Sequence, residues 1–297
     1  MPRIVLSTGN IVSAGPSIIR KPGTYRSNLE LINSLRSNFT GAQEDYGATT
    51  NGDQSHASNG VNGHAVNSWT ETDDSVLYIP RVDWSAAGLQ EDRAQYEITV
   101  KLFFLPTASP AKRAEHIQEA LRLVAKELRI EGVDLLIASF PGISFEGDCE
   151  WEADKINATM GNDDEEVATW AVLEDLFQQG KISKLGIAEF GSAKLQRFID
   201  KVTVRPAVDQ INIRNCCNVP PPLTKLAKAE GIELLTHGDS IDILPSGTIR
   251  ELLGSQGAGV LADDANIIPE WVVKYTAYIK NRGVIENKGY FAGADLV

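Results

Sequence analysis

The residues that could carry chemistry in this chain stand where apolar runs end. One run covers 134–138, begins after Gly132, leads into Ser139 and closes at Pro141. This pattern predicts a short buried strand. In parallel α/β folds the reacting groups lie just beyond the carboxyl ends of the strands. Ser139 therefore occupies a functional position, and the residue type found there bears on whether the chain works as an enzyme.

Histidine is the second residue type that could do chemistry here. Only His237 follows a predicted strand, 232–235, where it could act or could be a satisfied loop residue. His56 and His64 lie in a low-complexity segment, and a scattered histidine is rarely a ligand. His116 is predicted on the outer face of a helix.

Two adjacent cysteines, Cys216 and Cys217, also follow a predicted strand, 208–213. A reactive thiol needs a lowered pKa, and only Arg214 is near enough in sequence to supply positive charge. We therefore predict structural cysteines. A disulfide from this pair to another chain remains open, because adjacent cysteines seldom bridge each other.

Common cofactor and metal motifs do not occur in the sequence. It has no G-x-G-x-x-G, no G-x-x-x-x-G-K-[ST] and no C-x-x-C. The acidic run 163–166 could suggest a metal, but it immediately precedes a predicted helix over 167–179. Negative charge at a helix start complements the helix dipole. We expect neither a metal site nor a cofactor.

The composition narrows the class of partner. The 297 residues carry a net charge of −12, which argues against nucleic acid and against an anionic membrane surface. No apolar run approaches the roughly 20 residues that a membrane span requires. The three cysteines do not make a disulfide framework. These features predict a soluble protein of the cytoplasm.

Strand and helix patterns alternate along most of the chain. A helix is expected over 27–39, followed by a disordered Gly/Asn-rich insert over about 41–68. An acidic connector is expected over about 143–166. Further strands are predicted at 4–12, 97–104, 133–138, 184–187, 208–213 and 232–235, and helices at 110–128, 167–179, 192–199 and 223–230. This β-α order predicts one α/β domain over 1–297, with a closed (β/α)8 barrel favoured over a doubly wound open sheet.

Several strings resemble a known family in their order along the chain. They are 8–10 (Thr-Gly-Asn), 99–102, 134–137, 180–187, 205–210 and 228–232. Together they resemble the landmarks of aldo-keto reductases, which implies a (β/α)8 barrel, NADPH and an Asp-Tyr-Lys-His tetrad. The resemblance places Lys101 at the lysine and Ser139 at the histidine. The tyrosine would be Tyr46, but Gly41 stands where the aspartate is expected.

The resemblance also implies a changed cofactor side. Gln210 matches the glutamine beneath the nicotinamide, whereas Glu189 replaces the asparagine that binds the carboxamide. His237 falls at the position of the aromatic residue that stacks on the ring. Because tetrad partners tune the acidity of the tyrosine, their loss lowers the rate by orders of magnitude. We interpret these positions as relics of a reductase site.

A narrower resemblance covers nearly the whole chain. The strings 215–224, 233–239, 271–275 and 280–290 resemble the regulatory (modifier) subunits of glutamate–cysteine ligase. That family implies a non-catalytic, reductase-like barrel that binds the ligase catalytic subunit as a heterodimer. It also implies better glutamate use and weaker feedback inhibition by glutathione. The alternatives are a diverged NADPH-dependent aldo-keto reductase and a scaffold or redox sensor that uses the two adjacent cysteines.

The predicted partner surface is the barrel rim, with the C-terminal segment second. The candidate contact residues are Asn215, Cys216, Cys217, Pro220, Pro221, His237 and Asp239.

Overall fold

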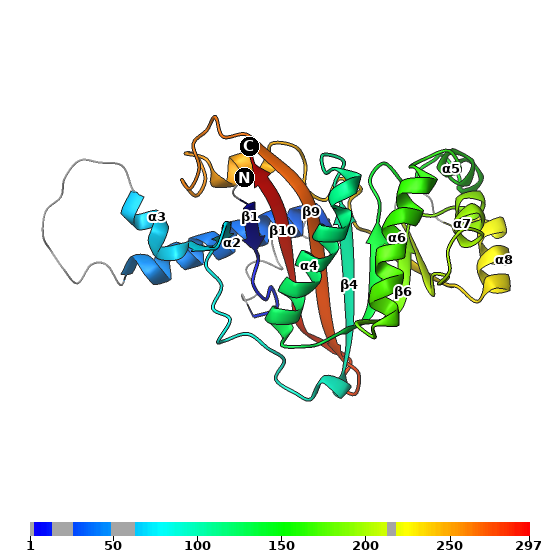
Figure 1. The fold of residues 1–297 in the computed structure, drawn as a ribbon, viewed down its shortest axis with the longest axis horizontal. Helices are drawn as coiled ribbons and strands as arrows, with labels where there is room; N and C mark the ends of the chain where they lie inside the picture. Colours follow the sequence, from blue (N-terminus) through cyan, green and yellow to red (C-terminus); the bar gives the residue numbers. More distant parts are fainter. Residues whose placement is uncertain (1–2, 14–25, 49–62, 213–217) are drawn as a thin grey trace, which may run out of the picture.

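The computed structural model describes residues 3–13, 26–48, 63–212 and 218–297. Their strands form one ten-stranded sheet in the order β2-β3-β1-β10-β9-β4-β5-β6-β7-β8. The strands are β1 (Arg3–Ser7), β2 (Glu71–Asp73), β3 (Val76–Ile79), β4 (Tyr96–Phe104), β5 (Val133–Ser139), β6 (Ile182–Ala188), β7 (Val208–Asn212), β8 (Glu233–His237), β9 (Ile267–Ile279) and β10 (Val284–Leu296). Figure 1 shows β9 and β10 as the two longest strands, at the centre of the molecule.

Helices pack against the sheet and connect its parallel strands. They are α2 (Ser27–Ala48), α3 (Gly63–Trp69), α4 (Arg113–Leu128), α5 (Glu150–Asn157), α6 (Asp163–Gln178), α7 (Ser192–Ile199), α8 (Pro221–Glu230) and α9 (Thr248–Leu253). Short 3-10 turns at 93–95 and 110–112 precede β4 and α4. In Figure 1, α5, α7 and α8 gather at one end of the molecule, and α2 and α3 lie at the other.

The predicted α/β fold class is confirmed. β4 to β8 are consecutive parallel neighbours, and at least one helix joins each to the next. The strands predicted between 97 and 235 and the helices between them are present, with boundaries shifted by a few residues. The predicted strand over 4–12 is shorter, ending at Ser7.

The strand order departs from a simple ring of eight parallel strands. β9 and β10 form a long antiparallel hairpin between β1 and β4, so that β1 joins the parallel strands only through this hairpin. Within the described residues β2 and β8 stand at the two ends of the order. The hairpin has no counterpart among the elements predicted from the sequence. Its signal is the run 271–275 of β-branched and aromatic residues and the left-handed Gly283 at the turn, φ +67°.

Parts of the predicted insert at 41–68 are helical, which corrects the expectation of disorder for them. α2 starts at the predicted Ser27 but continues to Ala48, and α3 begins at Gly63. Phe39 and Trp69 explain this, because both are buried and their ring centroids lie 6.0 Å apart. Apolar residues that flank a polar segment thus anchor its helical ends. Residues 49–62, which include His56, lie outside the described residues, and the structure describes only the backbone of His64.

The acidic connector contains a helix, α5, and its last four residues begin α6. The predicted helix therefore starts at Asp163 rather than at residue 167. Asn162 caps it by accepting hydrogen bonds from the backbone N–H groups of Asp164 and Glu165, at 3.2 and 3.3 Å. Two of the carboxylates also bind cations of α7. Hydrogen bonds from Arg197 and Lys194 lower the pKa of Asp163 to about 2.

His116 is fully buried, so its predicted place on the outer face of α4 is wrong. The residue belongs to the buried stripe of α4 that also holds Arg113, Ile117 and Ala120. Its Nε2 lies 3.0 Å from Oε2 of Glu270, a buried residue of β9. Burial lowers the pKa of His116, and the Glu270 carboxylate opposes that shift. A polar residue thus occupies a core position because a strand outside the predicted set supplies its partner.

Both faces of the sheet carry apolar clusters, so the sheet is buried on two sides. Val5 packs into the cluster beneath α4, α6 and α7, while its neighbours Ile4 and Leu6 pack into the cluster beneath α2 and α9. This alternation follows from the two-residue period of a strand.

We expect Gly293→Ala to lower the free energy of unfolding by about 1–3 kcal/mol. A Cβ there would lie 2.3 Å from the Trp271 ring, and Trp271 is fully buried. Gly41→Ala is the matched control, because its Cβ meets no atom within 4 Å on α2. It should raise the free energy of unfolding by about 0.5–1 kcal/mol. Chemical denaturation measures both, and equal effects would contradict the packing described for the hairpin.

Candidate functional site

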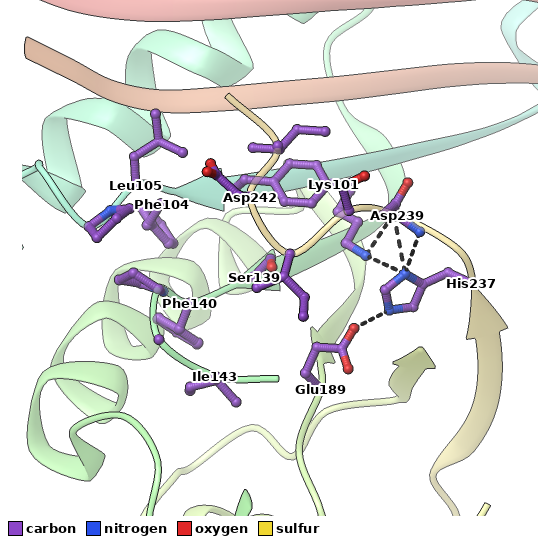
Figure 2. Close-up of a pocket in the computed structure, with 17 residues that line it drawn as sticks. Lys101, Phe104, Leu105, Ser139, Phe140, Ile143, Glu189, His237, Asp239 and Asp242 are labelled. Carbon is purple, nitrogen blue, oxygen red and sulfur yellow. Dashed lines mark hydrogen bonds and ion pairs between the residues drawn. The ribbon is translucent and has the colours of Figure 1, made fainter. Parts of the chain in front are cut away.

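One pocket at the carboxyl ends of the parallel strands holds four of the positions that the reductase resemblance singles out, together with Asp239. Lys101 comes from β4, Ser139 ends β5, Glu189 follows β6, His237 ends β8 and Asp239 follows it. All five line a cavity of about 150 Å³, and Figure 2 shows their side chains around it. The structure thus brings these five residues together at the strand ends. Gln210 of β7 joins the group through a hydrogen bond from Lys101.

Lys101 is the buried centre of this group. Its Nζ donates to Oδ2 of Asp239 at 2.9 Å and to Oε1 of Gln210 at 2.8 Å. Asp239 also pairs through Oδ1 with Nζ of Lys274, at 3.0 Å. Burial alone would raise the pKa of Asp239, yet the two ammonium groups hold that pKa well below its ordinary value. Burial lowers the pKa of Lys101, and Asp239 opposes that shift.

His237 forms a second contact pair in the pocket. Its Nε2 lies 2.6 Å from Oε1 of Glu189, and both side chains are buried. The backbone N–H of Asp239 donates to Nδ1 of His237 at 3.1 Å. Since a backbone N–H can only donate, Nδ1 accepts, and the neutral ring carries its proton on Nε2, toward Glu189. The ring is thus oriented by its own loop and by a carboxylate.

The backbone holds Glu189 in an unusual conformation. Its φ is +68°, a left-handed value that side chains other than glycine rarely adopt. Asn157 Nδ2 donates to the Glu189 carbonyl at 2.6 Å, and the Glu189 N–H donates to the Gln210 carbonyl at 2.9 Å. The neighbouring Asp209 is buried, which raises its pKa well above the ordinary value. The Glu189 carboxylate is therefore aimed at His237 by a fixed backbone.

Tyr46 does not join this group. It lies on α2 and lines a separate pocket, where Arg81 stacks over its ring with the guanidinium carbon 5.0 Å from the centroid. No tyrosine is among the described residues that line the Lys101 pocket. The lysine and the tyrosine suggested by the resemblance are therefore not assembled as a proton-donating pair in the described structure.

The predicted partner residues fall into three groups. Asn215, Cys216 and Cys217 lie outside the described residues. Pro220, Asp239 and the side chain of His237 are buried, the last two in the contacts above, so none of them is a ready contact for another chain. Pro221 is exposed at the start of α8. Cys149 is also exposed, just before α5.

Lys274 was missed by sequence reasoning, although it is part of the site. It lies in a stretch of β9 whose neighbouring residues are mainly apolar. In the strand register it pairs with Lys101 of β4. A lysine within such a stretch signals a buried or half-buried partner. The partner, Asp239, is seen only in the folded structure.

The residues of this pocket do not fit the nicotinamide cofactor that the fold family implies. Its 150 Å³ is below the roughly 300–1,000 Å³ of small-molecule sites. Glu189 presents a carboxylate already engaged with His237, and Lys101 is engaged with Asp239. Within the described residues no cluster of three or more His, Cys, Asp or Glu side chains could hold a metal ion. The helices that the structure describes are too short or too polar to span a membrane.

Comparison with known proteins identifies the family. Residues 83–244 match the sequence model of the Aldo/keto reductase family, and the chain belongs to that family. The matched segment contains β4 to β8 and the Lys101 pocket.

Curated relatives confirm the narrower resemblance. A Schizosaccharomyces pombe protein named putative glutamate–cysteine ligase regulatory subunit is 28% identical over 97% of this chain and 94% of its own length. The mouse glutamate–cysteine ligase regulatory subunit is 28% identical over 69% of this chain and 68% of its own length. The human one is 27% identical over the same shares.

Solved structures match more weakly. A Brucella melitensis aldo/keto reductase superposes with a TM-score of 0.36 at 20% identity, covering 49% of this chain and 47% of that one. A Bombyx mori aldo-keto reductase in complex with NADP gives a TM-score of 0.33 at 22% identity, covering 46% and 39%.

We expect Lys101→Met to lower the free energy of unfolding by about 3–5 kcal/mol, because it leaves Asp239 buried with one cation fewer. Lys155→Met, on the exposed face of α5, is the control and should change it by less than about 0.5 kcal/mol. In a double-mutant cycle with Asp239→Asn, the two losses should be non-additive by about 1–3 kcal/mol. Additive losses in urea denaturation would show that the pair is not coupled.

Proposed function

We propose that this chain is the non-catalytic regulatory subunit of a glutamate–cysteine ligase. The observation that carries the proposal is the match to a relative of that name over 97% of this chain and 94% of the relative. A match of this extent includes the C-terminal hairpin, which lies outside the segment shared with aldo/keto reductases in general.

The Lys101 pocket supports a role without chemistry of its own. Its charged groups bind one another: Lys101 and Lys274 engage Asp239, and His237 engages Glu189. A general acid must be free to exchange a proton with a substrate atom. Groups that pair with one another in a small cavity instead make a structural network.

Regulation would then act through binding to the catalytic subunit as a heterodimer in the cytoplasm. The chain would favour the state of its partner that binds glutamate over the state inhibited by glutathione. A binding protein shifts such an equilibrium only by its difference in affinity for the two states. Better glutamate use and weaker feedback inhibition are two results of one preference.

Co-expression with the catalytic subunit of the same organism tests the proposal. The two chains should elute together in size-exclusion chromatography. The complex should have a glutamate KM lower, and a glutathione inhibition constant higher, by about fivefold or more than the catalytic subunit alone. The catalytic subunit mixed with bovine serum albumin is the control. Separate elution with unchanged constants would refute the proposal.

The tip of the β9–β10 hairpin is the favoured contact surface. Tyr278, Val284 and Ile285 are large apolar residues that stay more than a third exposed there. Solvent-exposed apolar side chains that gather on one element mark interaction sites. We therefore favour the C-terminal segment, the second choice from the sequence, over the barrel rim. At the rim, Pro220 and Asp239 are buried.

Ile285→Ser should weaken the complex about tenfold, because it removes an apolar contact at the hairpin tip. Ile156→Ser on α5 is matched in residue type and in exposure, 40% against 43%, and should leave the affinity unchanged. Surface-based binding measurements give both values. If Ile156→Ser weakens the complex and Ile285→Ser does not, the contact surface lies on α5.

A further inference from the structure

A second pocket lies beside the end of β1, away from the Lys101 site. Its cavity measures about 320 Å³, within the range of small-molecule sites. Its walls come from the end of β1, from α2, from the segment 80–87 and from α4. The two pockets share no lining residue.

Glu127 of α4 is the buried acid of this pocket. The residue is 91% buried, at 9% exposure, and lines the cavity. Its carboxylate accepts one hydrogen bond, from Oη of Tyr275 at 3.4 Å, and forms no ion pair with a described residue. Burial raises the pKa of Glu127, and only the Tyr275 hydroxyl opposes that shift. A buried carboxylate without a cation is costly, which a bound cation would relieve.

The backbone around Tyr275 is shaped to hold this arrangement. A Cβ at Gly289 would lie 2.3 Å from Oη of Tyr275 and 2.5 Å from the carbonyl oxygen of Gly9. Glycine is therefore required for the hydroxyl to approach the floor of the pocket, which Gly9 lines. Burial raises the pKa of Tyr275 well above its ordinary value, so the phenol stays a donor to Glu127.

The alternation of side chains along β9 separates the second pocket from the Lys101 pocket. Lys274 and Tyr275 are neighbours on β9 and project from opposite faces of the sheet. Lys274 reaches Asp239 of the first pocket, whereas Tyr275 reaches Glu127 of the second. A ligand at Glu127 would therefore not contact the Lys101 network.

The charge of the pocket indicates what it binds. Three carboxylates line it, those of Glu127, Asp45 and Asp83, against one guanidinium, that of Arg81. Among the described residues, no group of three or more His, Cys, Asp or Glu side chains has a geometry that could hold a metal ion. Pro80 and Val82 are among the apolar residues of the wall, which also contains the polar side chains of Ser7, Asn38 and Tyr46.

We propose that this pocket binds a small organic ammonium compound, with its charged group at the Glu127 carboxylate and its apolar part against Pro80 and Val82. The ammonium would complete the hydrogen bonding of Glu127 beside the Tyr275 hydroxyl. The cavity volume suits a compound with a short apolar body. The proposal does not depend on the proposed regulatory function.

Isothermal titration calorimetry with benzylammonium chloride tests it, with benzyl alcohol as the uncharged probe of equal shape. Benzylammonium should bind the whole chain saturably at millimolar concentration, and benzyl alcohol should bind at least tenfold more weakly. Glu127→Gln should weaken benzylammonium binding about ten- to a hundredfold, because it removes a charge-assisted hydrogen bond. Glu131→Gln, on the exposed surface outside the pocket, should not change it.

A thermal melt separates binding from a structural role. Because burial penalises the Glu127 charge, Glu127→Gln should melt at the same or a higher temperature without ligand. If the variant folds poorly, Asp45→Asn decides instead, since Asp45 is exposed at the rim and its loss should weaken binding about two- to fivefold. No saturable binding, equal binding of both probes, or unchanged affinity in the deciding variant overturns the proposal.

Discussion

The contact on which the structure depends is the ion-paired group of buried Lys101 and Asp239 with the half-buried Lys274. It joins β4, the segment after β8 and β9, three parts of the chain that are far apart in sequence. Removing such charges from water is expensive, so their attraction contributes little net stability relative to apolar packing. Removing Asp239, however, leaves Lys101 buried without a counter-ion, and removing Lys101 leaves Asp239 buried with one cation fewer. The group therefore fixes how the C-terminal hairpin and the parallel strands fit together.

The same group shows how the strand ends of a reductase-type fold can be occupied by ion pairs. The lysine at the tetrad position keeps its place on β4 but donates to Asp239 and Gln210. Glu189 and His237 use their charged and polar atoms on each other. Family membership thus defines the scaffold, whereas the side chains at the strand ends define what the scaffold does. In this chain they make a closed network, which fits a protein that works by contact.

The parallel half could be predicted from the sequence because its signals are local. The run ending at Ser139 and the helix stripe of Ile117 and Val124 follow the periods of a strand and a helix. The predicted convergence of Lys101, Ser139, Glu189, Gln210 and His237 on one site followed from the resemblance and the strand-end rule, and the structure brings these residues together.

The remaining features depend on partners distant in sequence. Asp239 was expected at a partner surface, but Lys274 of the unpredicted hairpin buries it. His116 was expected on the exposed face of its helix, but it is buried in contact with Glu270 of the same hairpin. The sequence around Glu127 does not indicate that its side chain is buried, because that burial depends on β9 and on the segment after β3. The errors at Asp239 and His116 trace to the hairpin, since one missing strand pair changes the surroundings of the residues that it covers.

We propose that the chain acts without reductase chemistry, because Lys101, at the position of the tetrad lysine, lies in an ion network with Asp239 and Lys274. The most direct test is NADPH consumption by the purified chain with a panel of aldehydes, measured beside Lys101→Met. We expect no NADPH consumption above background for either protein. NADPH-dependent reduction by the wild-type chain that is lost in Lys101→Met would contradict the proposal.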